Sequence, residues 1–273
     1  YDFFVNGFTF ETNLAVSGGN EKRQYYVSAG RMQRNGFVPL STFYRNSFFA
    51  DFRQKVSKNL TLGSKLYLFN THGQRAQKGS GISSVTRGVM RTPPSFDNSN
   101  ENGSGREAIR QASTFITPLD NGLRSFSRFG IENPYASVRN PHSDQVNGQL
   151  FQFDLDWQIA SNWRLDAGLF FDTRNEQRNT AFDVLSASVN DGYYEERNYD
   201  LTDFYLTTAI HYQRQLNQNL KVQASLGYWR TLQRINSDFT AVNPLFTPGN
   251  FSLNNGNIVG NSELSVDHTI QNV

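Results

Sequence analysis

The fold is decided by the stretch FQFDLDWQIASNWRLDAGLFF, residues 151–171. Apolar and polar residues alternate on both sides of a short central segment, Ala160-Ser161-Asn162. Successive side chains of a strand point to opposite faces, so each half of the stretch predicts a strand with one apolar and one polar face. The two apolar sets share a face if Ile159 pairs with Trp163. The stretch therefore predicts a β-hairpin with a three-residue turn.

The same turn pattern occurs three times in the chain, each time between alternating runs. Its Asn falls on the third loop position, which in a common three-residue hairpin loop has the left-handed conformation. Asn adopts that conformation more readily than any residue except Gly, so we expect it at Asn59, Asn162 and Asn219. The repetition predicts one antiparallel sheet whose short turns lie at the same end. The three copies are Val56–Leu60, Ile159–Trp163 and Leu216–Leu220.

Apolar residues at a spacing of two predict eight strands and the start of a ninth. The β-branched and aromatic content of these runs agrees with strand rather than helix. An N-terminal hairpin, with its turn around Gly18-Gly19-Asn20, follows the pattern less cleanly. The predicted strands cover about 8–17, 24–33, 43–56, 60–71, 148–159, 163–174, 199–215 and 220–231, and the ninth begins near 263.

The connections at the other end of the predicted sheet are long, near 72–147, 175–198 and 232–262. A loop as long as the first is uncommon inside a compact soluble domain. Short turns at one end and long extracellular loops at the other are typical of outer-membrane β-barrels. We therefore expect residues 1–273 to be part of a transmembrane antiparallel β-barrel domain, with these three connections as extracellular loops.

Composition fits this interpretation and excludes other classes. The net charge is +2 and there is no basic stripe, so the sequence does not predict nucleic-acid binding. The mean hydropathy of −0.58 is low, but only alternate residues of a barrel strand face lipid. No run of about 18 apolar residues predicts a membrane-spanning helix. The chain has no Cys, and hence no disulfide or thiol chemistry.

The hairpin faces supply candidate functional residues. Polar residues opposite the apolar set predict a wet barrel interior, and the candidates are Asp154, Asp156, Arg164 and Asp166. Aromatic residues near strand ends predict a membrane-interface girdle. In that girdle, Trp157, Trp163 and Tyr212 lie near the short turns, and Tyr228 and Trp229 lie at the opposite end.

Sites for catalysis, metals and cofactors are not predicted. The four His residues are far apart in sequence and share no ligand spacing. No nucleotide-binding or nucleophile motif occurs. We therefore expect no enzyme activity, no metal and no cofactor. Tyr193 and Tyr194, in the expected 175–198 loop, could stack on sugar rings, although packing against neighbouring loops explains them more simply.

Four segments resemble a known family. Leu14–Lys22, with GGNEK at its end, and Tyr25-Tyr26-Val27-Ser28 resemble a signature of the SusC/RagA family of TonB-dependent outer-membrane transporters. Gly36-Phe37-Val38-Pro39 and Asn133-Pro134-Tyr135-Ala136 resemble two further segments of that family. The match follows the family order over most of residues 1–231.

The resemblance implies a barrel of about 22 strands with a plug, of which this chain supplies eight or nine strands. It implies import of oligosaccharides or peptides across the bacterial outer membrane, together with a SusD-like surface lipoprotein and the TonB complex. The plug domain and the C-terminal strands are not found in these residues, so we expect the chain to be the middle of a longer protein. Two alternatives stay open: a non-transporting outer-membrane barrel that acts as an adhesin or structural protein, and a soluble carbohydrate-binding β-sandwich.

Overall fold

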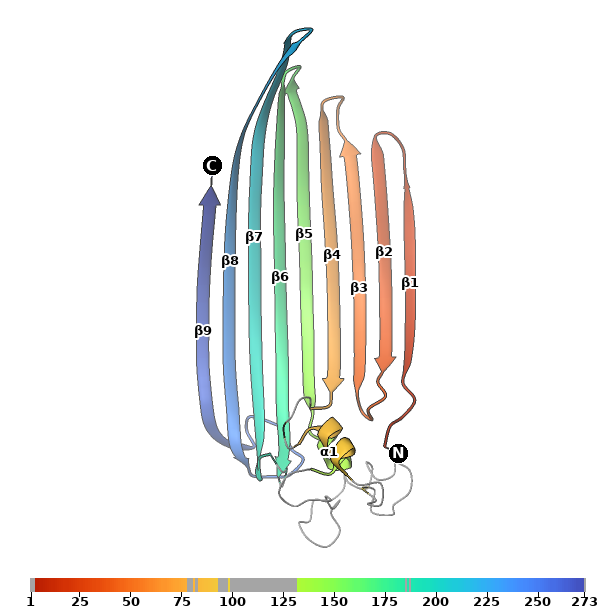
Figure 1. Cartoon of the computed structure of the whole chain (residues 1–273), viewed down its shortest axis with the longest axis vertical. Helices are drawn as coiled ribbons and strands as arrows, with labels where there is room; N and C mark the ends of the chain where they lie inside the picture. The colour runs from red at the N-terminus through yellow and green to blue at the C-terminus, as the bar shows by residue number, and fades with distance from the viewer. Residues whose placement is uncertain are drawn as a thin grey trace.

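The computed structural model describes residues 3–77, 81, 83–92, 98, 132–184, 186 and 188–272. They form one antiparallel sheet of nine strands, in which each strand lies beside its sequence neighbours (Figure 1). This confirms the all-β class and the ninth strand. The strands are β1 (Phe8–Gly19), β2 (Arg23–Asn35), β3 (Thr42–Lys55), β4 (Leu60–Arg75), β5 (His142–Ala160), β6 (Trp163–Val184), β7 (Asp191–Asn217), β8 (Leu220–Leu245) and β9 (Gly256–Asn272).

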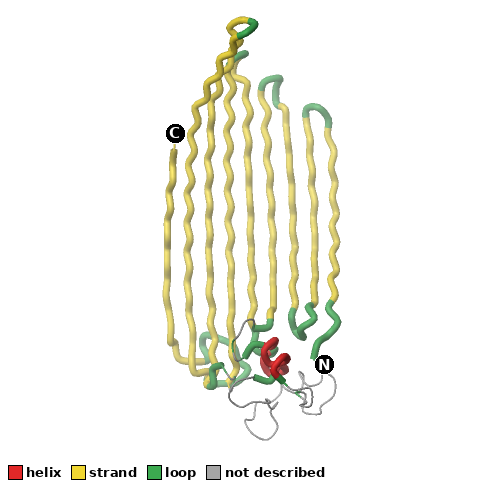
Figure 2. Tube along the Cα trace, in the orientation of Figure 1, coloured by secondary structure: helices red, strands yellow, loops and turns green. Residues whose placement is uncertain are grey.

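Short turns lie at one end of the sheet, and the longer connections and the helices lie at the other (Figure 2). The helices are α1 (Val85–Arg91) and α3 (Pro134–Ser137). The side chain of Asn133 caps α3 by accepting a hydrogen bond from the backbone N–H of Tyr135 at 2.8 Å. Pro134 follows at the first helical position, where its missing N–H costs nothing. Among the described residues, no helix combines the length and the apolar character needed to cross a bilayer.

The register of the hairpins is the predicted one over most of their length. The backbone N–H of Val56 donates to the Leu60 carbonyl at 2.9 Å. In the second hairpin Trp157 lies opposite Leu165, and Gln158 opposite Arg164. The register then shifts, so that Ala160 rather than Ile159 pairs with Trp163. A similar shift occurs between Gln215 and Asn217 in the third hairpin.

The left-handed conformation predicted for Asn59, Asn162 and Asn219 is wrong. In the described part of the chain, Leu40 is the one non-glycine residue with positive φ, at 63°. The register shifts let the second and third turns close over two residues instead of three. In the third turn the Asn217 side chain accepts a hydrogen bond from the backbone N–H of Asn219 at 2.9 Å. Side-chain hydrogen bonding thus replaces the left-handed residue.

Two of the three expected long loops are mostly strand. β6 and β7 continue through the expected 175–198 loop and leave 185–190 as their connection. β8 and β9 continue through 232–262 and leave 246–255. Polar residues occupy both faces of these extensions, so a pattern of apolar residues cannot show them. The first connection runs over 76–141, and within it 78–80, 82, 93–97 and 99–131 lie outside the described residues.

Buried apolar residues gather in two clusters near the long connections. One joins the two helices to the N-terminal segment, where the rings of Phe3 and Tyr135 are 5.0 Å apart. The other lies on the extensions of β6–β8, where Phe251 and Leu253 of the last connection pack against the cluster. These clusters stabilise the long connections against the ends of the strands. The first contains Phe3, Val85, Val89, Tyr135 and Val138, and the second Ala181, Tyr194, Val242 and Leu245.

Candidate functional site

The sheet has one apolar face and one polar face, which we define by their cross-strand rows. The apolar face carries a row of directly opposed residues from β4 to β8: Leu66, Phe151, Phe171, Phe204 and Leu232. Large side chains on this face are open to the surroundings, since Phe151 is 38% exposed, Trp157 42% and Leu226 62%. The polar face carries the residues between them, such as Gln152 and Asp154.

The apolar residues form a band of limited height across the strands. In β5 the band runs from Phe151 to Ile159 in alternate positions. At about 3.3 Å per residue this is about 26 Å, close to the length of a strand that crosses a bilayer. Arg230 of β8 lies on the same face, opposite Leu206, and interrupts the band there. In β5 the band therefore has about the residue length of a tilted strand that crosses a bilayer.

A groove with a cavity volume of about 760 Å³ lies on the polar face and crosses β2–β7. Asp154, Asp156, Arg164 and Asp166 all line it. The four candidates predicted from the hairpin therefore lie on one face, around one cavity.

Charged groups in the groove are partly paired. Arg164 Nη2 donates to Asp166 Oδ2 at 2.6 Å, and His211 Nε2 lies 3.0 Å from the same oxygen. Asp156 lies directly opposite Asp166 on the neighbouring strand. Arg164 lies opposite Gln158 and donates to one of these two carboxylates, so oxygen atoms of the pair keep acceptor capacity for ligand N–H groups. Within the described part of the chain, no three His, Asp or Glu side chains form a group that could hold a metal ion.

Three of the five aromatic residues expected in the girdle lie near the short turns, and the other two do not lie at the opposite strand ends. Trp163 lies opposite Tyr212 with their rings 4.8 Å apart, and Trp157 lies opposite Leu60 close to the short turns. Tyr228 and Trp229 are not at the opposite end, because β8 continues to Leu245. As chain neighbours in a strand, these two residues also lie on opposite faces of the sheet. Their role at a membrane interface stays a prediction.

Tyr193 and Tyr194 lie in β7, not in a loop. They point to opposite faces, and Tyr194 is only 6% exposed within its apolar cluster. The hydroxyl of Tyr194 donates to Glu196 Oε1 at 2.7 Å, and that of Tyr193 donates to Glu195 Oε2 at 2.5 Å. The pKa of both phenols is raised. Burial is the main cause, and the hydrogen bonds to the two glutamates add to it. The pair therefore does not form one ligand surface.

Sequence reasoning missed a junction at the long-connection end. Asp183 Oδ1 accepts a hydrogen bond from the backbone N–H of Gly249 at 2.8 Å, and Asp183 Oδ2 lies 3.6 Å from Arg139 Nη2. The Asn140 side chain accepts from the backbone N–H of Asp183 at 2.9 Å. Asp183 thus joins two of the long connections to the end of β6. No local motif marks it, because its partners are about 40–70 residues away in the chain.

A second missed feature is a pair of carboxylates on the polar face. Asp172 and Asp203 lie directly opposite each other, and both are buried. Arg174 donates to Asp172 at 2.8 Å, and Gln233 donates to Asp203 at 2.9 Å. Like charges in this arrangement repel each other, so these donors stabilise the pairing. The hairpin register, extended to a third strand, would have shown the pair.

No family model and no curated protein matches the chain. Solved structures do match. The RagAB peptide importer in the 'closed-closed' state superposes with a TM-score of 0.73 at 16% identity, over 96% of this chain and 29% of that one. The 'open-open' state gives 0.68 at 17% identity, over 98% and 29%. A further RagAB peptide transporter structure gives 0.68 at 16% identity, over 96% and 28%.

The chain therefore spans less than a third of the length of the structures that it matches. At this level of identity the likeness concerns the fold. The structures are of importers rather than enzymes, and in them the matching part is a sector of a larger protein. The resemblance to the SusC/RagA family is thus confirmed for the fold: the chain has the fold of the matching part of the RagAB peptide importer.

Proposed function

We propose that this chain is a sector of the barrel of a SusC-like TonB-dependent transporter in the bacterial outer membrane. In this proposal the apolar face contacts lipid and the polar face lines the interior. The observation that carries the proposal is the register, which keeps apolar residues on one face across β4–β8. A closed barrel would pair the free edges of β1 and β9, as a membrane requires.

The cargo of the proposed transporter is an oligopeptide or an oligosaccharide. The groove on the polar face is lined by four aspartates and by Arg53, Lys65 and Arg164. It supports a cargo with polar groups of both kinds, because the carboxylates accept and the basic side chains donate hydrogen bonds. A SusD-like surface lipoprotein and the TonB complex would be its partners. The likeness to structures of the RagAB peptide importer supports the peptide and a two-protein assembly.

Two adjacent threonines offer a sharp test of the interior. Both residues border the groove, but the Thr207 side chain lies on the polar face, whereas the Thr208 side chain lies on the apolar face opposite Ala167 and Tyr228. In the full-length protein, Thr207→Trp narrows the groove and should lower the uptake of labelled oligopeptides or oligosaccharides by cells. Thr208→Trp adds the same ring on the lipid side and should leave uptake unchanged.

The uptake experiment also separates the alternatives. Equal uptake by the two variants would show that the groove is not on the cargo path. Uptake of neither cargo class by the unaltered protein would favour a non-transporting barrel. The described residues form a single sheet with an open apolar face, which does not support the soluble β-sandwich.

A further inference from the structure

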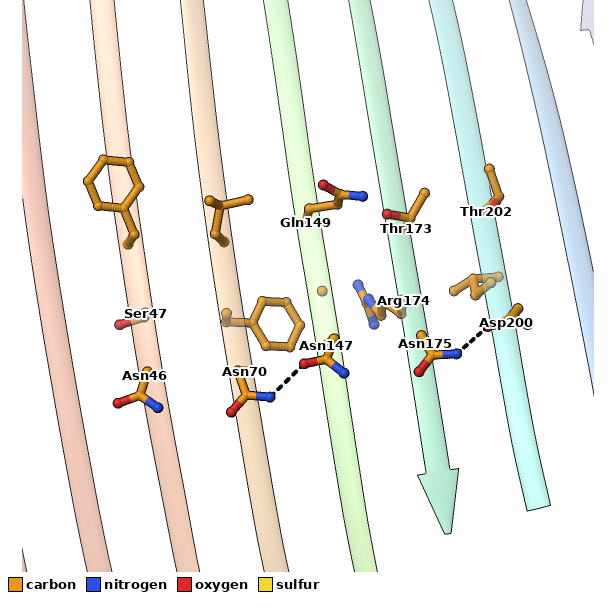
Figure 3. A pocket seen from close by; sticks show the side chains of 15 residues that line it. Asn46, Ser47, Asn70, Asn147, Gln149, Thr173, Arg174, Asn175, Asp200 and Thr202 are labelled. Carbon is orange, nitrogen blue, oxygen red and sulfur yellow. Dashed lines mark hydrogen bonds between the residues drawn. The ribbon is translucent and has the colours of Figure 1, made fainter. Parts of the chain in front are cut away.

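A row of four asparagine side chains and one aspartate crosses the apolar face where the apolar band ends, on the side of the long connections. Its members lie directly opposite one another in successive strand pairs from β3 to β7 (Figure 3). Asn70 donates to Asn147 at 2.5 Å, and Asn175 donates to Asp200 at 2.5 Å. The change from rings to amides occurs within two rows. We call this set the amide row: Asn46, Asn70, Asn147, Asn175 and Asp200.

A groove with a cavity volume of about 690 Å³ runs along the amide row. Its other side is formed by the next row toward the band: Phe48, Leu68, Gln149, Thr173 and Thr202. Beyond that row follow Phe151, Phe171 and Phe204 of the apolar band. The groove therefore lies on the boundary between polar and apolar surface, where an amphiphile would place its head group and its chains.

The chemistry of the groove favours a neutral ligand rich in hydroxyl groups. An Asn side chain has two donor hydrogens and one acceptor oxygen, and each pair in the row uses only part of this capacity. Among the residues that line the groove on the apolar face, Asp200 is the one charged side chain, and its carboxylate accepts hydroxyl hydrogens. Two arginines lie beside the lining on the same face: Arg234, opposite Thr202, is paired with Asp267, and Arg31 lies opposite Asn46 at the end of the row. Arg174 lies between the rows, but it faces the other side and donates to Asp172 at 2.8 Å.

Resting on the proposed membrane location, we propose that this groove binds the sugar head group of a membrane glycolipid. The amide row contacts the sugar hydroxyls, and the acyl chains lie along the apolar band below. An aromatic girdle is the usual border of a barrel's apolar band. Here amide and hydroxyl groups form that border over β5–β7, and these groups suit sugars better than phosphates.

Native mass spectrometry of the full-length protein tests this proposal. The protein is offered equal amounts of digalactosyl diacylglycerol and phosphatidylglycerol with the same acyl chains. We expect about a tenfold preference for the galactolipid, which corresponds to a few modest hydrogen bonds. Asn70→Leu with Asn147→Leu should remove the preference. Thr71→Leu with Val146→Leu changes the chain neighbours on the opposite face and should keep it.

A charge variant keeps the test decisive if the leucine variant does not fold. Asn147→Arg supplies a cation and should shift the preference toward phosphatidylglycerol. Equal retention of both lipids by the unaltered protein would overturn the proposal, and so would a preference for phosphatidylglycerol. Competition by free digalactose at the same concentration would show a site for free sugar instead, and a second copy seated on the groove would show a dimer interface. A protein that does not float with vesicles at all would refute the membrane location itself.

Discussion

Asp154 and Leu155 are neighbours in the chain but lie on opposite faces of the sheet. Asp154 lies between Gly63 and Gly168 and lines the polar groove, whereas Leu155 lies between Leu62 and Ala167 on the apolar face. In the proposed barrel, this alternation turns one residue toward water and the next toward lipid.

Leu155→Arg in the full-length protein should hinder membrane insertion. An Arg side chain on the lipid face near the bilayer midplane costs about 2–4 kcal/mol, and less near an interface. Asp154→Asn, on the wet face, should fold normally. Urea titration of the protein in vesicles measures both free energies of unfolding. Equal tolerance of the two substitutions would contradict the assignment of the faces.

Gly148 is required by an aromatic ring on the polar face. A Cβ at this position would lie 2.2 Å from Cζ of Phe69, so the ring would have to move. We expect Gly148→Ala to destabilise the protein by about 1–3 kcal/mol through overpacking. Phe69→Ala should remove most of that penalty in the double variant. A double-mutant cycle of unfolding free energies checks this, and additive effects would show that the two residues are not coupled.

Asp183→Ala should loosen the long-connection end without unfolding the sheet. The substitution removes the acceptor of the Gly249 N–H and leaves the half-buried Arg139 without this carboxylate. The loss of this hydrogen-bond acceptor and charge partner costs about 1–3 kcal/mol. Hydrogen exchange of 183–191 and 246–255 should become faster, while β5 near Phe151 stays protected. Asp191→Ala, at an exposed position, is the control and should change neither region.

His142 makes this end of the sheet sensitive to acid. It is the first residue of β5 and lies outside the apolar band. Burial lowers the pKa of His142 below its ordinary value. The positive charge of Arg75 lowers this pKa further, whereas the negative charge of Glu195 raises it. As the pH falls through about 6.5, the unfolded state therefore binds the proton before the folded state does, and stability decreases.

The pH effect can be followed by hydrogen exchange near His142, corrected for the intrinsic rate, between pH 7.5 and 5.5. We expect exchange to increase at the lower pH in the unaltered protein and to increase less in His142→Gln. The same increase in both proteins would show that another group is responsible.

The sequence predicted the fold best where each strand has one apolar and one polar face. From Phe151 to Phe171 the alternation predicted the strands, their register and the faces of Asp154 and Asp166. It failed beyond Thr173, where polar residues occupy both faces and the ladder continues on backbone hydrogen bonds. It also failed at Asn59, because the turn chemistry depends on local hydrogen bonds that composition does not determine.

The residues of the candidate site were likewise predictable only where apolar and polar residues alternate. The acidic residues of the groove were predictable because their strand neighbours are apolar. Asp183 and its partner Gly249 were not, since contacts between connections far apart in the chain have no periodic signal. The amide row was predictable only in part. Each Asn can be read from the sequence, but their alignment follows from the register across five strands.

The most direct test of the account uses a nitroxide spin label placed in turn at each position from 151 to 159 of the full-length protein in lipid vesicles. We expect accessibility to oxygen, which dissolves in acyl chains, to peak at the odd positions, and accessibility to a water-soluble nickel chelate to peak at the even positions. A profile without this period of two, or with the two peaks exchanged, would contradict the claim that the apolar face contacts lipid.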